Sequence, residues 1–147
     1  MAHPKMFADD DLLLERVRQI ALTFPEAQER VSHGSPNWFH RKTFASWRAH
    51  IKGEHDSTRL NRALCFLPDE QERIALLDDE RFHVPAYIGH SGWLALDLAH
   101  HLGEAGRTQL HSDDADGVDW DEVRELIDMS YRNTGAPKKL LAQLDSH

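Results

Sequence analysis

The chain has 147 residues, the size of one ordinary domain, and its 40% hydrophobic and 29% charged content is typical of a folded globular protein. Its net charge of −8 means that the average surface repels nucleic acid and anionic membranes. No apolar run approaches the roughly 18 residues that span a bilayer, which excludes an integral membrane protein.

Cysteine content and the first residues indicate the compartment. The single cysteine, Cys65, excludes an internal disulfide and a multi-cysteine zinc site. Residues 1–11 lack the apolar core of a signal peptide and contain three consecutive acids. We therefore expect a cytoplasmic protein with no membrane partner.

Hydrophobic periodicity predicts a helix near the start of the chain. Leu13, Val17 and Ile20 fall on one helical face. The acidic run at 9–11 supplies N-cap oxygens just before them. Pro25 disfavours helical geometry at the residue before it, so the helix should end shortly upstream.

The next segment has the composition of β-strands. Gly34 and Pro36 indicate a turn. From Thr43 to Ile51, small and apolar residues alternate with polar ones, which predicts one half-buried antiparallel strand. The short apolar run at 63–67 predicts a central strand.

Shorter elements follow. Pro68 opens a predicted short helix whose inward face is Ile74 and Leu77. Pro85 makes the segment around it an edge strand or loop. Leucines at alternate positions in 94–98 predict a strand that faces inward.

The last third begins with a polar stretch. Residues 99–118 lack periodicity and predict a loop or insertion, whose aspartates, Asp114 among them, are expected to be solvated. Asp119 then caps a predicted helix that ends at Gly135, and a final helix starts at Pro137. The whole order predicts one α+β domain with an antiparallel sheet packed by helices.

No pattern in the sequence indicates catalysis. The eleven histidines lack the spacing of a metal site, and the glycines form no phosphate-binding loop. Ser32 and Ser35 lack a nucleophile elbow, and Cys65 lies in an apolar strand where burial makes a thiol inert. We therefore expect a non-enzymatic protein with no metal, no cofactor and no catalytic residues.

Charge is unevenly distributed along the chain. Residues 38–62 contain six basic residues against two acidic ones, a net charge of +4 in a protein whose remainder carries −12. Aromatic residues are interleaved with these cations. The cations can bind phosphates and the aromatic rings can stack on bases. Alternatively, the aromatics form core and the cations pair with surface acids. The candidate nucleic-acid contacts are Arg41, Lys42, Arg48 and Lys52.

A second candidate site comes from two glycine-containing turns, one at 33–36 and one at 87–90. Both are rich in side chains that form hydrogen bonds, and we expect them to line one concave surface. The candidate ligand-groove residues are His33, Ser35, Tyr87, His90 and Trp93.

Short signatures occur in a recognisable order along most of the chain. They are Phe24-Pro25-Glu26-Ala27, Ser32-His33-Gly34-Ser35-Pro36, Lys42-Thr43-Phe44-Ala45, Phe82-His83-Val84-Pro85-Ala86-Tyr87-Ile88-Gly89-His90-Ser91-Gly92-Trp93, Asp119-Trp120-Asp121-Glu122-Val123 and Ser130-Tyr131-Arg132. In this set the chain resembles the small bacterial YjbR/MmcQ-like family, whose members often carry the label DNA-binding protein. The resemblance implies a CyaY-like α+β fold and a double-wing mode of DNA binding.

Two functions remain open. The first is a cytoplasmic binding protein that contacts DNA weakly and without sequence preference through the four cations. The alternative is a module that binds a protein or a small ligand in the groove between the two turns.

Overall fold

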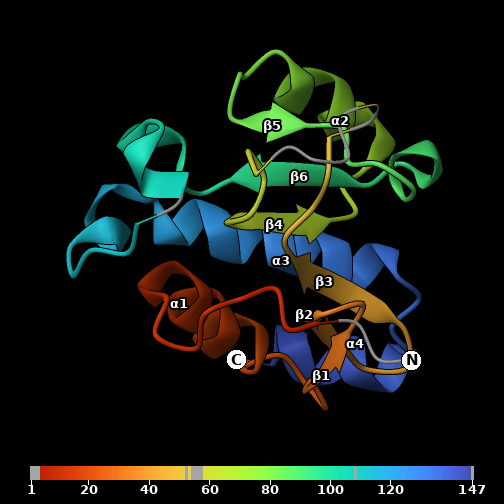
Figure 1. Ribbon diagram of the computed structural model, residues 1–147. Helices are drawn as coiled ribbons and strands as arrows, with labels where there is room; N and C mark the ends of the chain where they lie inside the picture. Colours follow the sequence, from red (N-terminus) through yellow and green to blue (C-terminus); the bar gives the residue numbers. More distant parts are fainter. Residues whose placement is uncertain (1–3, 52, 54–57, 108, 147) are drawn as a thin grey trace.

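A six-stranded antiparallel sheet forms the centre of the protein in the computed structural model, which describes residues 4–51, 53, 58–107 and 109–146. The strands are β1 (Gln28–Ser32), β2 (Ser35–Phe39), β3 (Thr43–Trp47), β4 (Ala63–Phe66), β5 (Phe82–His83) and β6 (Leu94–Asp97). Their spatial order is β1-β2-β3-β4-β6-β5, which confirms the predicted central position of β4 and edge position of β5 (Figure 1).

Helices lie before, between and after the strands along the chain. The α-helices are α1 (Leu12–Ala21), α2 (Glu70–Leu77), α3 (Trp120–Asn133) and α4 (Lys138–Asp145). The 3-10 helices are η1 (Gly89–Ser91), η2 (His100–Leu102), η3 (Ala105–Arg107) and η4 (Asp114–Gly117). The predicted α+β class with a helix-packed antiparallel sheet is confirmed. Within the described part of the chain, none of the helices is long and apolar enough to cross a bilayer.

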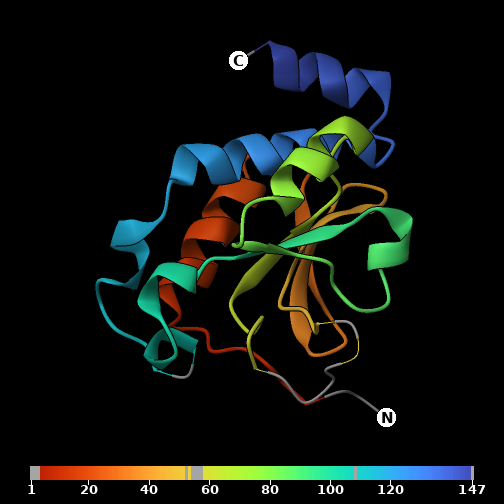
Figure 2. The ribbon, with the colours of Figure 1, turned by 90° about the horizontal axis from the view of Figure 1, so that it is seen from above.

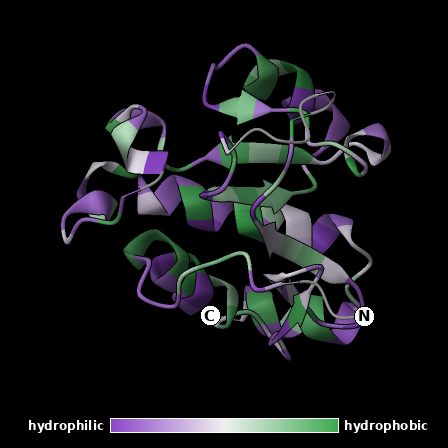
Figure 3. Cartoon of the chain, in the orientation of Figure 1, coloured by the Kyte–Doolittle hydropathy of each residue, from purple (hydrophilic) through white to green (hydrophobic). Residues whose placement is uncertain are grey.

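The main core lies between α1, α3 and one face of the sheet. Figure 2 shows α3 and α4 on one side of the sheet and the N-terminal segment on the other. Along β4 and β6 every residue is buried, whereas α3 alternates hydrophobic and hydrophilic residues (Figure 3). The largest fully buried side chains of this core include Trp38, Trp47, Phe44, Tyr131 and Leu64.

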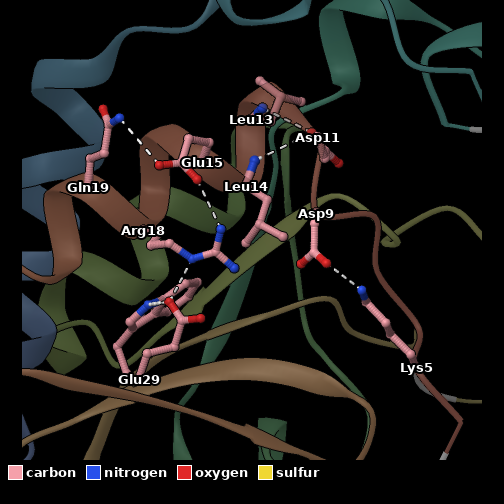
Figure 4. Close-up of polar contacts among 10 residues, drawn as sticks. Lys5, Asp9, Asp11, Leu13, Leu14, Glu15, Arg18, Gln19 and Glu29 are labelled. Atoms are coloured by element: carbon pink, nitrogen blue, oxygen red, sulfur yellow. Dashed lines mark hydrogen bonds and ion pairs between the residues drawn. The ribbon is translucent and has the colours of Figure 1, made fainter.

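Helix α1 starts and packs as its sequence predicts. The Asp11 carboxylate accepts hydrogen bonds from the backbone amides of Leu13 and Leu14 and so caps the helix (Figure 4). On the side facing the sheet, Arg18 donates to Glu29 of β1 at 2.8 Å. The prediction that Asp119 caps α3 is also confirmed, since its carboxylate accepts from the Glu122 amide at 3.1 Å.

A buried arginine joins four parts of the chain. Arg62, immediately before β4, makes a bidentate contact to Asp11, with nitrogen–oxygen distances of 2.7 and 2.9 Å. It also donates to the Gly106 carbonyl at 2.8 Å and lies 3.0 Å from Asp114. Each of the three charged side chains is at most 5% exposed. The expectation that Asp114 is solvated is therefore wrong, because its carboxylate neutralises Arg62.

Two other expectations fail for identifiable reasons. The strand predicted to run from Thr43 to Ile51 ends at Trp47, because Arg48 takes a left-handed conformation with φ 74°. In α2, Ile74 is 70% exposed, and Leu76 rather than Ile74 or Leu77 packs against the core. The four apolar residues of α2 are consecutive in sequence, so their spacing does not define one helical face.

Removing the buried guanidinium should destabilise the fold strongly. Arg62→Met leaves two buried carboxylates without a cation, and we expect the free energy of unfolding to fall by about 3–5 kcal/mol. Arg132 is a matched control, because it also contacts two carboxylates, Asp128 and Asp145, but at the surface. Arg132→Met should cost less than about 1 kcal/mol. Urea denaturation followed by circular dichroism measures both, and equal losses would contradict the assignment.

Candidate functional site

The sheet face opposite α1 and α3 carries a row of small and polar side chains. Strand pairing places Asn37 beside Ser46, and Ser46 beside Cys65. In the neighbouring row, Trp47 and Leu64 belong to the main core on the helix side. Because side chains alternate between the two faces of a strand, the polar row is directed away from the helices. It forms the floor of a pocket.

The turn between β1 and β2 forms one wall. Only His33 and Gly34 lie between the paired strands, and both have positive φ, 54° and 83°, as a type I′ hairpin turn requires. Ser35 and Pro36, which were predicted to belong to the turn, are the first residues of β2. A Cβ on Gly34 would overlap the Pro4 carbonyl oxygen, so only glycine lets the N-terminal segment approach this closely.

Two further segments complete the walls. The Met6 amide donates to the Gly34 carbonyl at 2.8 Å and fixes the N-terminal segment along the rim. On the other side, the Ala86 amide donates to the His50 carbonyl at 2.7 Å, which holds Tyr87 beside the end of β3. Each contact joins residues that are far apart in the sequence, Met6 with Gly34 and His50 with Ala86.

The enclosed space, which we call the β2–β3 pocket, has a volume of about 730 Å³. It combines an apolar part around Met6 and Ile88 with hydroxyl, amide, imidazole and guanidinium groups. Its lining residues are Pro4, Met6, Ser32, His33, Ser35, Asn37, Ser46, Trp47, Arg48, Ala49, His50, Cys65, Ala86, Tyr87 and Ile88.

Unusual backbone conformations concentrate around this pocket. Among the described residues, four non-glycine positions have positive φ, and three of them line the pocket: His33, Arg48 and Tyr87. Such conformations are costly for residues with a Cβ, and they persist where surrounding contacts hold them. They are known to cluster at ligand sites.

Two polar groups in the pocket lack partners within the part of the chain that the structure describes. The Ser35 side chain is buried, with 6% of the residue exposed, and its Oγ makes no hydrogen bond there. Arg48 is half-buried and forms no ion pair with the described acids. Burial lowers the pKa of its guanidinium, because charge is less well solvated there than in water.

Neither an ionised thiol nor a metal-binding cluster is found among the described residues of this site. Burial raises the pKa of the Cys65 thiol to about 12, so the thiol stays protonated at neutral pH. Its sulfur donates to the Arg48 carbonyl at 3.8 Å. Across the residues with described positions, no group of three or more His, Cys, Asp or Glu side chains converges to hold a metal ion.

The structure brings together three of the five groove residues named from the sequence: His33, Ser35 and Tyr87. His90 lies apart from them, because η1 turns the chain toward α2 and places His90 in a second cavity beside Ile74. Trp93 packs against the small cluster of Leu60, Ala63, Cys65 and Ala95 instead.

Several lining residues were missed by sequence reasoning. Asn37 and Ser46 alternate with buried Trp38, Ala45 and Trp47, and this alternation was the available signal for a polar sheet face. Which polar residues of the two strands lie side by side depends on the register, which the sequence did not define.

The four predicted nucleic-acid contacts are spread over different environments. Arg41 and Lys42 are exposed in the turn between β2 and β3, and neither forms an ion pair with another described residue. Arg48 lines the β2–β3 pocket, and Lys52 lies outside the described residues.

The aromatic residues near these cations mostly belong to the core. Trp38, Phe44 and Trp47 are at most 2% exposed, as the core interpretation of the segment predicts. Phe39 is half-buried, and the Arg30 guanidinium lies 4.2 Å from its ring centroid. The three buried rings therefore cannot stack on nucleic-acid bases.

Fold and site together define an α+β domain with a polar pocket on the sheet face opposite its core helices. The YjbR family model matches residues 22–133, and the chain belongs to this family. The matched span runs from the end of α1 to the end of α3 and contains every lining residue of the pocket except Pro4 and Met6. Neither a curated protein nor a solved structure matches the chain.

Thiol reactivity tests the description of the pocket floor. With a pKa of about 12, Cys65 should not react with Ellman's reagent at pH 8 in the native protein, and one thiol should react after denaturation in guanidinium chloride. Rapid stoichiometric labelling of the native protein would show that the floor is open and the thiol ionisable.

Proposed function

We propose that the protein is a binding protein that holds a small molecule in the β2–β3 pocket. The observation that carries this proposal is the concentration of left-handed residues there, with His33, Arg48 and Tyr87 from three separate segments. Each such residue costs on the order of 1–3 kcal/mol, and strain of this kind clusters at ligand sites.

The dimensions and composition of the pocket fit this role. Its volume of about 730 Å³ lies within the range of roughly 300–1,000 Å³ that small-molecule sites occupy. Such sites combine an apolar lining with a few polar groups that orient the ligand. Here Met6 and Ile88 provide apolar surface, and Ser35 and Arg48 provide hydrogen-bond donors.

DNA binding is a second candidate, favoured by the exposed pair Arg41 and Lys42. Both lack an ion pair among the described residues, so both remain available for phosphate groups. Neither residue lines the pocket, so this contact is independent of the pocket lining. The net charge of −8 limits any such contact to weak, sequence-independent binding.

Fragment binding tests the first proposal. A library of small organic compounds, screened by two-dimensional amide NMR, should give shifts that concentrate on pocket residues. Tyr87→Ala removes one wall and should weaken the strongest hit about tenfold, while Ile74→Ala should leave it unchanged. The control is matched because Tyr87 is 69% and Ile74 is 70% exposed. Hits scattered over the surface, or equal effects of the two variants, would contradict the proposal.

A salt titration tests the second candidate. Each neutralised phosphate contributes about 0.9 to the slope of log affinity against log salt concentration. Contacts from Arg41 and Lys42 therefore predict a slope of about −1.8 for duplex DNA, measured by fluorescence anisotropy. The double variant Arg41→Ala/Lys42→Ala should abolish this slope. Absence of binding at low salt, where attraction is strongest, would exclude DNA as a partner.

A further inference from the structure

We propose that the ligand of the β2–β3 pocket is a small organic oxyanion, a carboxylate or phosphate ester on an apolar body, with Arg48 as its counter-charge. This inference rests on the proposed function and specifies the chemical class of the ligand. It follows from the charge of the lining, the state of Arg48 and the buried hydroxyl of Ser35.

The lining differs in charge from the rest of the protein. The chain contains 25 acidic residues among 147, yet none of the described residues that line the pocket is Asp or Glu. Among these described lining residues, Arg48 carries the only formal charge, and His33 and His50 add imidazoles that can donate hydrogen bonds. An anion therefore meets attraction in this pocket on a surface that is acidic overall.

Arg48 also differs from Arg62 and Arg107, whose side chains are at most 10% exposed. Arg62 contacts Asp11 and Asp114, and Arg107 contacts Asp97 at 3.1 Å. Arg48 is half-buried without an ion pair to any acid in the described part of the chain. A partly desolvated cation without a counter-ion is unfavourable, and a ligand oxyanion relieves that cost. Guanidinium groups fit carboxylate and phosphate oxygens in a bidentate geometry.

The hydroxyl of Ser35 points to the same chemistry. Ser35 lines the pocket and is 6% exposed, and its buried Oγ has no hydrogen-bond partner among the described residues. A buried polar group without a partner is unfavourable, and a bound acceptor satisfies it. The side chains of Met6 and Ile88 provide apolar surface that can contact an uncharged body attached to the anion.

Three one-ring probes separate charge from shape. Benzoate carries a carboxylate, phenyl phosphate carries a phosphate ester, and benzamide is a neutral compound close in shape to benzoate. We expect isothermal titration calorimetry to show at least tenfold tighter binding of one of the two anions than of benzamide. Arg48→Gln should weaken that anion roughly 10- to 100-fold and leave benzamide unchanged. The two anion arms identify which oxyanion the pocket prefers.

Arg16→Gln is the matched control, because it removes an exposed guanidinium that stacks on Trp120, away from the pocket, and it should leave all affinities unchanged. Arg48→Lys keeps the charge but loses the bidentate geometry, and it should show an intermediate loss. If Arg48→Gln does not fold, the anion proposal is tested by two other measurements. These are the affinities of Arg48→Lys and the comparison of the anions with benzamide in the native protein. Equal binding of benzamide and both anions would overturn the anion proposal and leave the pocket as a ligand site. Failure of fragments of every kind to bind there would overturn the proposed function itself.

Discussion

The buried ion pairs of Arg62 fix the arrangement on which both the fold and the pocket depend. One guanidinium holds the N-cap residue of α1 through Asp11, the η3 turn through the Gly106 carbonyl and the η4 turn through Asp114. Because Asp11 is held, the preceding residues run back across the sheet edge to Gly34, where the Met6 amide forms its hydrogen bond. Asp11, which Arg62 anchors, therefore connects α1 with the segment that forms the N-terminal wall of the pocket.

The two faces of the sheet serve different purposes. One face packs against α1 and α3 and contains the large side chains of the core. The other is floored by Asn37, Ser46 and Cys65 and is walled by connecting segments rather than by the core helices. Connecting segments tolerate left-handed residues, and here His33, Arg48 and Tyr87 direct three separate segments around one space. The core thus packs on one face of these strands, and the proposed ligand site lies on the opposite face.

Local signals in the sequence predicted most of the fold. Acidic caps located the starts of α1 and α3, and an apolar run located β4. The inward face of α2 was not predictable, because the apolar residues of this helix are consecutive in sequence. The burial of Asp114 was not predictable either, because its ion-pair partner Arg62 is distant in sequence. The predicted turns at 33–36 and 87–90 both contribute residues to the pocket. Which polar side chains form the pocket floor depends on the strand register, which the sequence did not define. The left-handed conformation of Arg48, which ends β3, had no local sequence signal.

A crystal structure of the protein soaked with phenyl phosphate and benzoate is the most direct test of the proposed oxyanion site. We predict electron density for one of them in the β2–β3 pocket, with oxyanion atoms within hydrogen-bond distance of the Arg48 guanidinium and the Ser35 hydroxyl. Density confined to the exposed turn that carries Arg41 and Lys42 would contradict an oxyanion site in the β2–β3 pocket. So would an Arg48 guanidinium already paired with a carboxylate of the protein.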